Sequence, residues 1–225
     1  MATRPPMPAG EWYHCYSRGV DKRIVFQNKT DYERFLVHAY VANSSASRRV
    51  SDIADLHLHA VLANERFDAD PIVEIAAYCL MPTHVHFVLH QIKSGGIATF
   101  MQRVFTGYTM YFNNKNERTG PLFAGSFKSK HITDDAYLKR VIPYVLLNPI
   151  ELFERNWKRG VGNIATVGEK LLKYPYSNLP DMNGTIRPES KIPQKVLGDY
   201  YDRMPSLRDM LKDAREYYME ANPQV

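Results

Sequence analysis

Residues 79–89 are Cys79-Leu80-Met81-Pro82-Thr83-His84-Val85-His86-Phe87-Val88-Leu89, and this stretch decides the fold. Its second half alternates in the way that a β-strand does. Side chains two positions apart leave a strand by the same face, so the imidazoles of His84 and His86 can reach one metal ion. The alternate positions Val85, Phe87 and Leu89 are apolar. They predict a core on the other face of the strand.

A pair of imidazoles on one face suits a divalent cation that polarises a phosphate. Pairs of this kind also occur by chance, so two structural histidines are the alternative. A second pair, His57 and His59, lies in a stretch whose apolar residues recur at helical spacing. Side chains two residues apart on a helix point about 160° away from each other, so this second pair is not expected to share an ion. His14 and His90 are predicted to be peripheral, with contact to DNA as the alternative for His90, which shares the face of His84 and His86.

The composition is that of a globular protein with a basic excess. The chain has 225 residues, of which 44% are hydrophobic and 24% charged, enough for one domain and an appendage. The formal net charge of +5 favours a polyanionic partner, although many basic proteins bind no nucleic acid. Fifteen tyrosines and ten phenylalanines can stack on bases or fill a core.

The sequence contains no run of about 18 apolar residues, and its start lacks the apolar segment of a signal peptide. We therefore expect no membrane partner and a cytoplasmic location, associated with the nucleoid when DNA is bound. Cys15 and Cys79 resemble neither a disulfide framework nor a zinc site. Both are expected to be buried as small apolar residues.

The sequence before Pro149 predicts the order strand, helix, strand, strand, helix, strand, helix. The predicted elements are a strand at 12–20, a helix at 31–42 capped by Asn28 or Thr30, strands at 72–80 and 84–89, a helix at 97–113, a strand at 123–132, and a helix capped by Thr133 or Asp134. This order predicts an α+β fold of the split β-α-β type, an antiparallel sheet with helices on one face. We expect a disordered segment at 1–10, a domain at 11–180 and a helical or irregular appendage at 181–225, with a charged helix from about Ser206 to Ala221.

The helix after Asp134 carries Tyr144 and Asn148, four residues apart and therefore on one helical face. If that face lies over the two histidines, it brings a phenolic oxygen and an amide oxygen to the same ion. Such a set suits Mg²⁺ or Mn²⁺. The alternatives are a core role for Tyr144 and a helix-ending role for Asn148. Pro143 removes one helical N–H and can kink the helix.

Several blocks of sequence carry a resemblance to a known family. They are Leu80-Met81-Pro82-Thr83-His84-Val85-His86, Gly120-Pro121-Leu122-Phe123-Ala124-Gly125-Ser126-Phe127-Lys128-Ser129, Tyr144-Val145-Leu146-Leu147-Asn148-Pro149 and Tyr174-Pro175-Tyr176-Ser177. In this order they resemble the single-tyrosine HUH transposases, specifically the REP-associated tyrosine transposases. The likeness runs from about Trp12 to Asn178. Thr83 stands where the family usually has Asn.

The resemblance implies a ferredoxin-like domain that cuts and rejoins single-stranded DNA through a covalent tyrosine intermediate. By position, His84 and His86 match the metal-binding histidines, Tyr144 the nucleophile, and Asn148 the residue that completes the metal site. Mg²⁺ or Mn²⁺ is the implied cofactor, and no nucleotide cofactor is needed. The family recognises hairpin DNA formed by short palindromic repeats and often works as a dimer.

Basic side chains and other tyrosines complete the set of candidates. Four basic side chains suit contacts with the DNA backbone, namely Arg103, Lys128, Lys130 and Arg140. A solvated basic face explains each of them almost as well. Tyr108 and Tyr111 are the main rivals for the nucleophile, with packing or base stacking as their favoured role. The runner-up function is a nucleic-acid-binding protein or regulator on the same fold that does not cleave. A structural metal-binding domain is the third hypothesis for the function.

Overall fold

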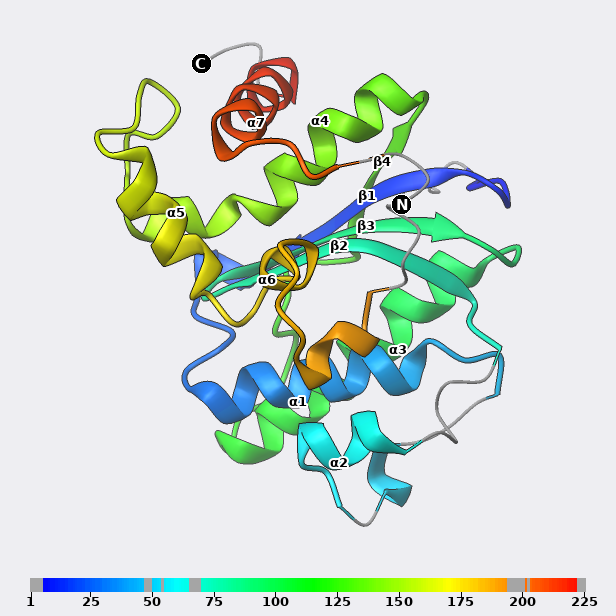
Figure 1. Cartoon of the computed structure of the whole chain (residues 1–225). Coiled ribbons are helices and arrows are strands. Elements are labelled where there is room, and N and C mark those ends of the chain that lie inside the picture. Colours follow the sequence, from blue (N-terminus) through cyan, green and yellow to red (C-terminus); the bar gives the residue numbers. More distant parts are fainter. Residues whose placement is uncertain are drawn as a thin grey trace.

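The computed structural model describes residues 6–46, 50–53, 55–64, 70–193, 201 and 203–221. Within these residues, four strands form one antiparallel sheet in the order β2-β3-β1-β4 (Figure 1). The strands are β1 (Trp12–Arg18), β2 (Val73–Met81), β3 (His84–Gln91) and β4 (Lys128–Ile132). The central pair β3 and β1 is flanked by β2 and β4, which is the order that a split β-α-β arrangement gives.

Helices cover both faces of this sheet. The α-helices are α1 (Lys29–Ala42), α2 (Leu58–Ala63), α3 (Gly96–Lys115), α4 (Asp135–Leu146), α5 (Ile164–Leu172), α6 (Leu179–Met182) and α7 (Leu207–Ala221), and the short 3-10 helices are η1 (Val20–Lys22), η2 (Val50–Asp52), η4 (Asn148–Leu152) and η5 (Pro188–Lys191). Helices α1 and α3 lie below the sheet, and α4 and α7 lie above it (Figure 1). The predicted α+β class with a helical C-terminal extension is confirmed. The expectation of helices on one face only is wrong, because α4 packs on the second face and α7 packs on α4 (Figure 1).

The starts of the helices follow from local chemistry. The Asn28 side chain accepts a hydrogen bond from the Asp31 backbone N–H at the start of α1. Asp134 does the same for Tyr137 at the start of α4, over 2.8 Å. Each cap satisfies a backbone donor that the first helical turn leaves without a partner. Both caps were among the predicted alternatives.

The face of the sheet toward α1 and α3 is an aromatic and aliphatic core. Val85, Phe87 and Leu89 have no exposed surface, as predicted. The Phe87 ring meets the Phe100 ring of α3 edge to face, with centroids 5.7 Å apart. Burying a side chain of this size stabilises the fold by about 1.5–3 kcal/mol, so this face holds the sheet against its helices.

Helix α4 continues through Pro143 to Leu146. Proline lacks the N–H that would bond to the carbonyl four residues earlier, here that of Lys139. The Tyr201 hydroxyl donates to this Lys139 carbonyl over 3.1 Å instead. The helix therefore keeps Tyr144 on its predicted face.

Strand β2 lies at one edge of the sheet, and the segment 174–178 covers that edge. Ser177 forms a bridge with Cys79, and the Leu80 N–H donates to the Tyr176 carbonyl. Next to a bulge between Ile75 and Ala77, the Asn178 side chain accepts from Tyr78 N–H and donates to the Ala76 carbonyl. An open edge and a bulge leave backbone groups without partners, so this segment satisfies them.

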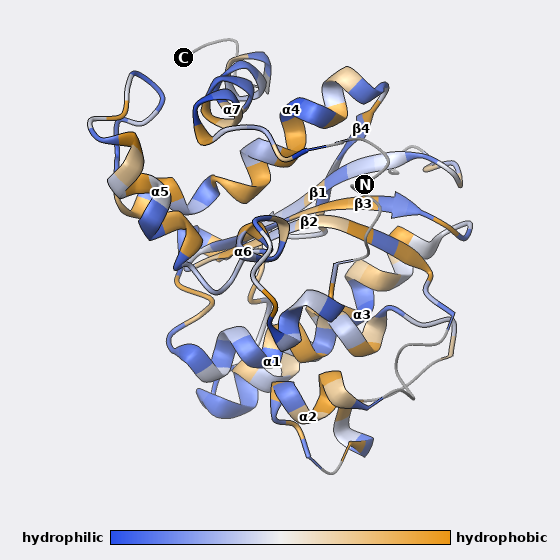
Figure 2. Ribbon diagram, in the orientation of Figure 1, coloured by the Kyte–Doolittle hydropathy of each residue, from blue (hydrophilic) through white to orange (hydrophobic). Residues whose placement is uncertain are grey.

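Hydropathy changes across the sheet. Figure 2 shows that β2 is mainly hydrophobic and that β4, at the opposite edge, is mainly hydrophilic. Among the described residues, none of the helices combines the length and apolar character needed to cross a bilayer.

Candidate active site

His84 and His86 leave β3 by the face that α4 covers, as the strand period predicts. Both are buried, and their ring centroids are 5.1 Å apart. His84 Nε2 lies 3.2 Å from Asn148 Oδ1, and its Nδ1 lies 3.0 Å from Thr83 Oγ1. The His84 ring is therefore held at both nitrogens.

Helix α4 brings Tyr144 to these histidines, and the start of η4 brings Asn148. The Tyr144 ring stands edge-on to that of His86, with centroids 5.8 Å apart. Asn148 follows the last turn of α4 and donates through Nδ2 to the Tyr144 carbonyl over 3.1 Å. Asn148 thus caps the end of the helix and also points its amide oxygen at His84.

His14 of β1 was predicted to be peripheral, and that prediction is wrong. His14 is buried, and its Nε2 lies 2.8 Å from His86 Nδ1. Its Nδ1 lies 2.7 Å from the hydroxyl of Tyr217 in α7. Strand alternation puts His14 on one face with Trp12 and Tyr16, but only the pairing of β1 with β3 shows that it is the histidine face.

Burial sets the charge state of these groups. Burial lowers the pKa of His84 and lowers that of His86 well below its usual value, where His14 and His84 lower it further. Both imidazoles are therefore neutral at neutral pH and keep a lone pair. Burial also raises the pKa of the Tyr144 phenol to about 12, with Glu151 adding to the shift and Asn148 opposing it.

Two of the predicted basic residues lie on the histidine face. Lys128 and Lys130 alternate on β4, where Lys128 pairs with Tyr16 and Lys130 with His14. The Lys130 ammonium lies over the rings of Tyr137 and Tyr217, 5.2 and 5.3 Å from their centroids. Lys128 is exposed. The two lysines therefore extend the site toward the β4 edge.

Arg140 lies on α4 but is engaged by α7. Its guanidinium is 3.3 Å from the Glu220 carboxylate and 5.5 Å from the centroid of the Tyr137 ring. The ion pair joins α7 to α4, and the ring contact, which lies within α4, holds the guanidinium in place.

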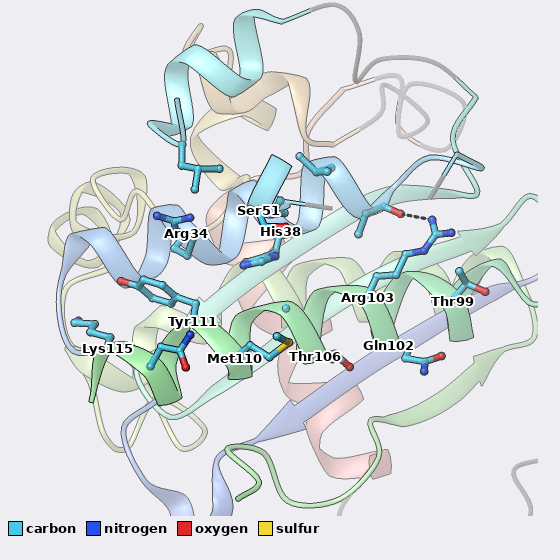
Figure 3. A pocket seen from close by; sticks show the side chains of 16 residues that line it. Arg34, His38, Ser51, Thr99, Gln102, Arg103, Thr106, Met110, Tyr111 and Lys115 are labelled. Carbon is cyan, nitrogen blue, oxygen red and sulfur yellow. Dashed lines mark hydrogen bonds between the residues drawn. The ribbon is translucent and has the colours of Figure 1, made fainter. Parts of the chain in front are cut away.

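Arg103 lies on the other side of the sheet, apart from the histidines. It lines a pocket of about 1070 Å³ between α1 and α3 and donates to the Ala42 carbonyl over 3.4 Å (Figure 3). It also donates to the Ser44 carbonyl over 2.6 Å. The rival tyrosines are on this side too. Tyr111 donates to the Asp31 carboxylate over 2.9 Å, and Tyr108 donates to the Val25 carbonyl. These contacts favour the packing role for both tyrosines.

The second histidine pair does not form a site. His57 precedes α2, and His59, within α2, lies 3.5 Å from the Glu189 carboxylate. The helical spacing at 52–64 is thus confirmed for the part that α2 covers.

The chemistry of the donor set fits a hard divalent cation in part. Among the described residues, no group of three or more His, Cys, Asp or Glu side chains could hold a metal ion. The set here is instead two imidazoles and an amide. Ligands at right angles around an ion, each about 2.1 Å from it, lie about 3 Å apart. The separation of 3.2 Å between His84 Nε2 and Asn148 Oδ1 agrees with that spacing.

Comparisons with known proteins complete the description. Neither a scan of protein-family models nor a search among curated proteins found a match. Among solved structures, the chain is similar to "Structure of the REP associates tyrosine transposase bound to a REP hairpin", with a TM-score of 0.47 and 14% sequence identity. The likeness covers 84% of this chain and 89% of that chain.

Proposed function

We propose that this protein is a metal-dependent single-stranded DNA endonuclease and strand transferase in which Tyr144 is the nucleophile. The observation that carries this proposal is the meeting of α4 with β3. It puts a phenol and an amide from one helical turn beside two neutral imidazoles, with His84 Nε2 3.2 Å from Asn148 Oδ1.

In the proposed step, the Tyr144 hydroxyl oxygen attacks a phosphorus atom of the DNA strand. A bond forms between that oxygen and phosphorus, and the bond from phosphorus to the 3′ oxygen breaks. The phenol loses its proton and the 3′ oxygen gains one, which gives a 5′-phosphotyrosine and a free 3′-hydroxyl. Because the new ester keeps the energy of the broken bond, another 3′-hydroxyl can attack it and release Tyr144. No nucleotide cofactor is required.

The site residues hold the reacting groups in place. With a pKa of about 12, the Tyr144 phenol carries its proton at neutral pH, so it is a weak nucleophile until that proton leaves. A divalent cation held by His84, His86 and Asn148 would polarise the phosphate and fix its orientation.

The β4 edge supports contact with the DNA backbone. Lys128 and Lys130 lie on the histidine face, and the formal net charge of the chain is +5. Lysine contacts with phosphate position a strand without reading its sequence. Hairpin DNA is the proposed substrate because the sequence blocks resemble a family that recognises hairpins.

The test is incubation of the full chain with labelled hairpin DNA and Mn²⁺, followed by denaturing electrophoresis. Wild type should form a protein–DNA adduct that survives denaturation, and Tyr144→Phe should not. Tyr111→Phe is the matched control, since this tyrosine is on the opposite side of the sheet. An adduct that survives Tyr144→Phe and is lost in Tyr111→Phe would reassign the nucleophile. Tight binding with no adduct over a panel of hairpins would favour the non-cleaving DNA-binding protein.

A further inference from the structure

A buried hydrogen-bonded chain links the candidate metal ligands to the C-terminal helix. His86 Nδ1 lies 2.8 Å from His14 Nε2, and His14 Nδ1 lies 2.7 Å from the Tyr217 hydroxyl. The exposed fractions of His86, His14 and Tyr217 are 7%, 3% and 2%. The three groups come from β3, β1 and α7, and His14 and Tyr217 are 203 positions apart.

The hydrogen bonds between His86, His14 and Tyr217 can run in two directions, and the direction decides whether His86 Nε2 can bind a metal ion. A neutral imidazole carries one N–H and one lone pair. In one direction His86 Nδ1 donates to His14 Nε2, and His14 Nδ1 donates to the Tyr217 oxygen. His86 then has its lone pair on Nε2. In the other direction Tyr217 donates to His14 and His14 donates to His86 Nδ1, so the His86 proton sits on Nε2 and blocks metal binding there.

The packing of α7 fixes the position of Tyr217, the last member of this hydrogen-bonded series. The ion pair between Arg140 and Glu220 holds α7 on α4. The Tyr217 ring lies against that of Tyr144, with centroids 4.7 Å apart, and the Lys130 ammonium lies 5.3 Å from the Tyr217 ring centroid. The planes of the His14 and His86 rings differ by 17°, and their centroids are 5.1 Å apart, so the two rings meet edge to edge through the hydrogen bond. These contacts leave the Tyr217 oxygen at His14 and hold the His86 ring in one orientation.

We propose that His14 and Tyr217 are positioning residues that keep the His86 Nε2 lone pair available to a divalent cation, and that α7 thereby completes the active site. The inference rests on the proposed function, because it takes His86 as a metal ligand. Hydrogen bonds of this kind, from a ligand's second nitrogen, orient the ligand and select its tautomer.

The experiment compares Tyr217→Phe with Tyr218→Phe, the next residue of α7, in the full chain. The Tyr218 ring contacts the Lys158 ammonium at 3.8 Å, and both nitrogens of His14 are taken by His86 and Tyr217. Mn²⁺ binding is measured by calorimetry, and the tautomers are read from the imidazole ¹⁵N shifts without metal. We expect Tyr217→Phe to weaken Mn²⁺ binding about 10-fold or more and to mix the His86 tautomers. Tyr218→Phe should match wild type in both measurements.

A second substitution separates the hydrogen bond from packing. His14→Gln offers an amide oxygen to His86, so it should keep more Mn²⁺ affinity than His14→Leu, which offers none. Equal losses in these two variants would overturn the inference.

The outcomes also separate this inference from the proposed function. Unchanged Mn²⁺ affinity and unchanged ¹⁵N shifts in Tyr217→Phe would overturn the positioning role, while adduct formation by wild type would still support the function. If Tyr217→Phe weakens Mn²⁺ binding but wild type forms no adduct, the positioning role is supported and the cleavage proposal fails. A wild-type protein that binds no Mn²⁺ would overturn both.

Discussion

Histidines are buried on both sides of the sheet, but in different surroundings. On the α1 side, His38 lies beside Arg34 in the pocket between α1 and α3 (Figure 3). On the α4 side, His14 and His86 share a hydrogen bond, and His84 reaches Asn148. An isolated buried imidazole chiefly makes stability depend on pH, whereas imidazoles that orient one another can form a binding site. The contrast between the two sides can be tested one residue at a time.

The largest expected effect is on the histidine side. His84→Ala and His86→Ala should each lower adduct formation by at least about 1,000-fold, because each removes a proposed metal ligand. Binding of hairpin DNA should fall much less, since lysine and arginine contacts with phosphate supply most non-specific affinity. Cleavage is measured by denaturing electrophoresis, and binding by fluorescence anisotropy. A parallel loss of binding and cleavage would mean that the histidines hold the DNA and not a catalytic ion.

His38 should give a pH effect on stability instead of an effect on cleavage. Burial, together with Arg34, lowers its pKa from 6.5 to about 4. Between these values the unfolded chain binds more protons than the folded one, so the free energy of unfolding falls as the pH drops from about 6.5 toward 4. This side chain accounts for up to about 3 kcal/mol of that fall.

The measurement is urea unfolding of wild type and His38→Gln at pH 7 and at pH 4.5. The variant should lose less stability on acidification, because it lacks the group that the unfolded chain protonates. Equal acid sensitivity in the two proteins would show that His38 does not titrate in this range. The adduct assay at pH 7 serves as the control and should give the same rate per folded molecule.

Val85 is a matched neighbour, since it stands between the two site histidines but faces the other side of the sheet. It is fully buried, and Val85→Ala removes about two methylene equivalents from the core. We expect the free energy of unfolding to fall by about 2 kcal/mol, measured by urea unfolding. Adduct formation per folded molecule should be unchanged. A large loss of cleavage without a loss of stability would mean that the two faces are not independent.

The same contrast explains what the sequence could and could not predict. Alternation in β3 is a local rule, so it correctly separates His84 and His86 from Val85 and Phe87. The spacing of Tyr144 and Asn148 is equally local. His14 could not be assigned, because its role depends on which strand pairs with β1.

Tyr217 was missed for a related reason. A charged helix at the C-terminal end was expected, but its docking on α4 brings together side chains that no short pattern connects. The predicted strand at 123–132 begins only at Lys128, because Phe123 pairs only with Gly19 in an isolated bridge. Helix α5 was not predicted, since its nine residues carry only a short apolar stripe, of which Val167 and Leu171 are buried.

The smallest expected effect concerns Thr83, which stands where the family that the sequence resembles usually has Asn. Its hydroxyl lies 3.0 Å from His84 Nδ1. If His84 binds a cation through Nε2, its proton sits on Nδ1 and the Thr83 oxygen accepts it. Thr83→Val keeps the shape but removes this acceptor, so Mn²⁺ binding and adduct formation should fall about 10-fold. Thr83→Asn offers an amide oxygen at the same position and should stay close to wild type. Wild-type behaviour of Thr83→Val in calorimetry would show that Asn148 and the strand alone orient His84, and that the histidine side needs less support than its hydrogen bonds suggest.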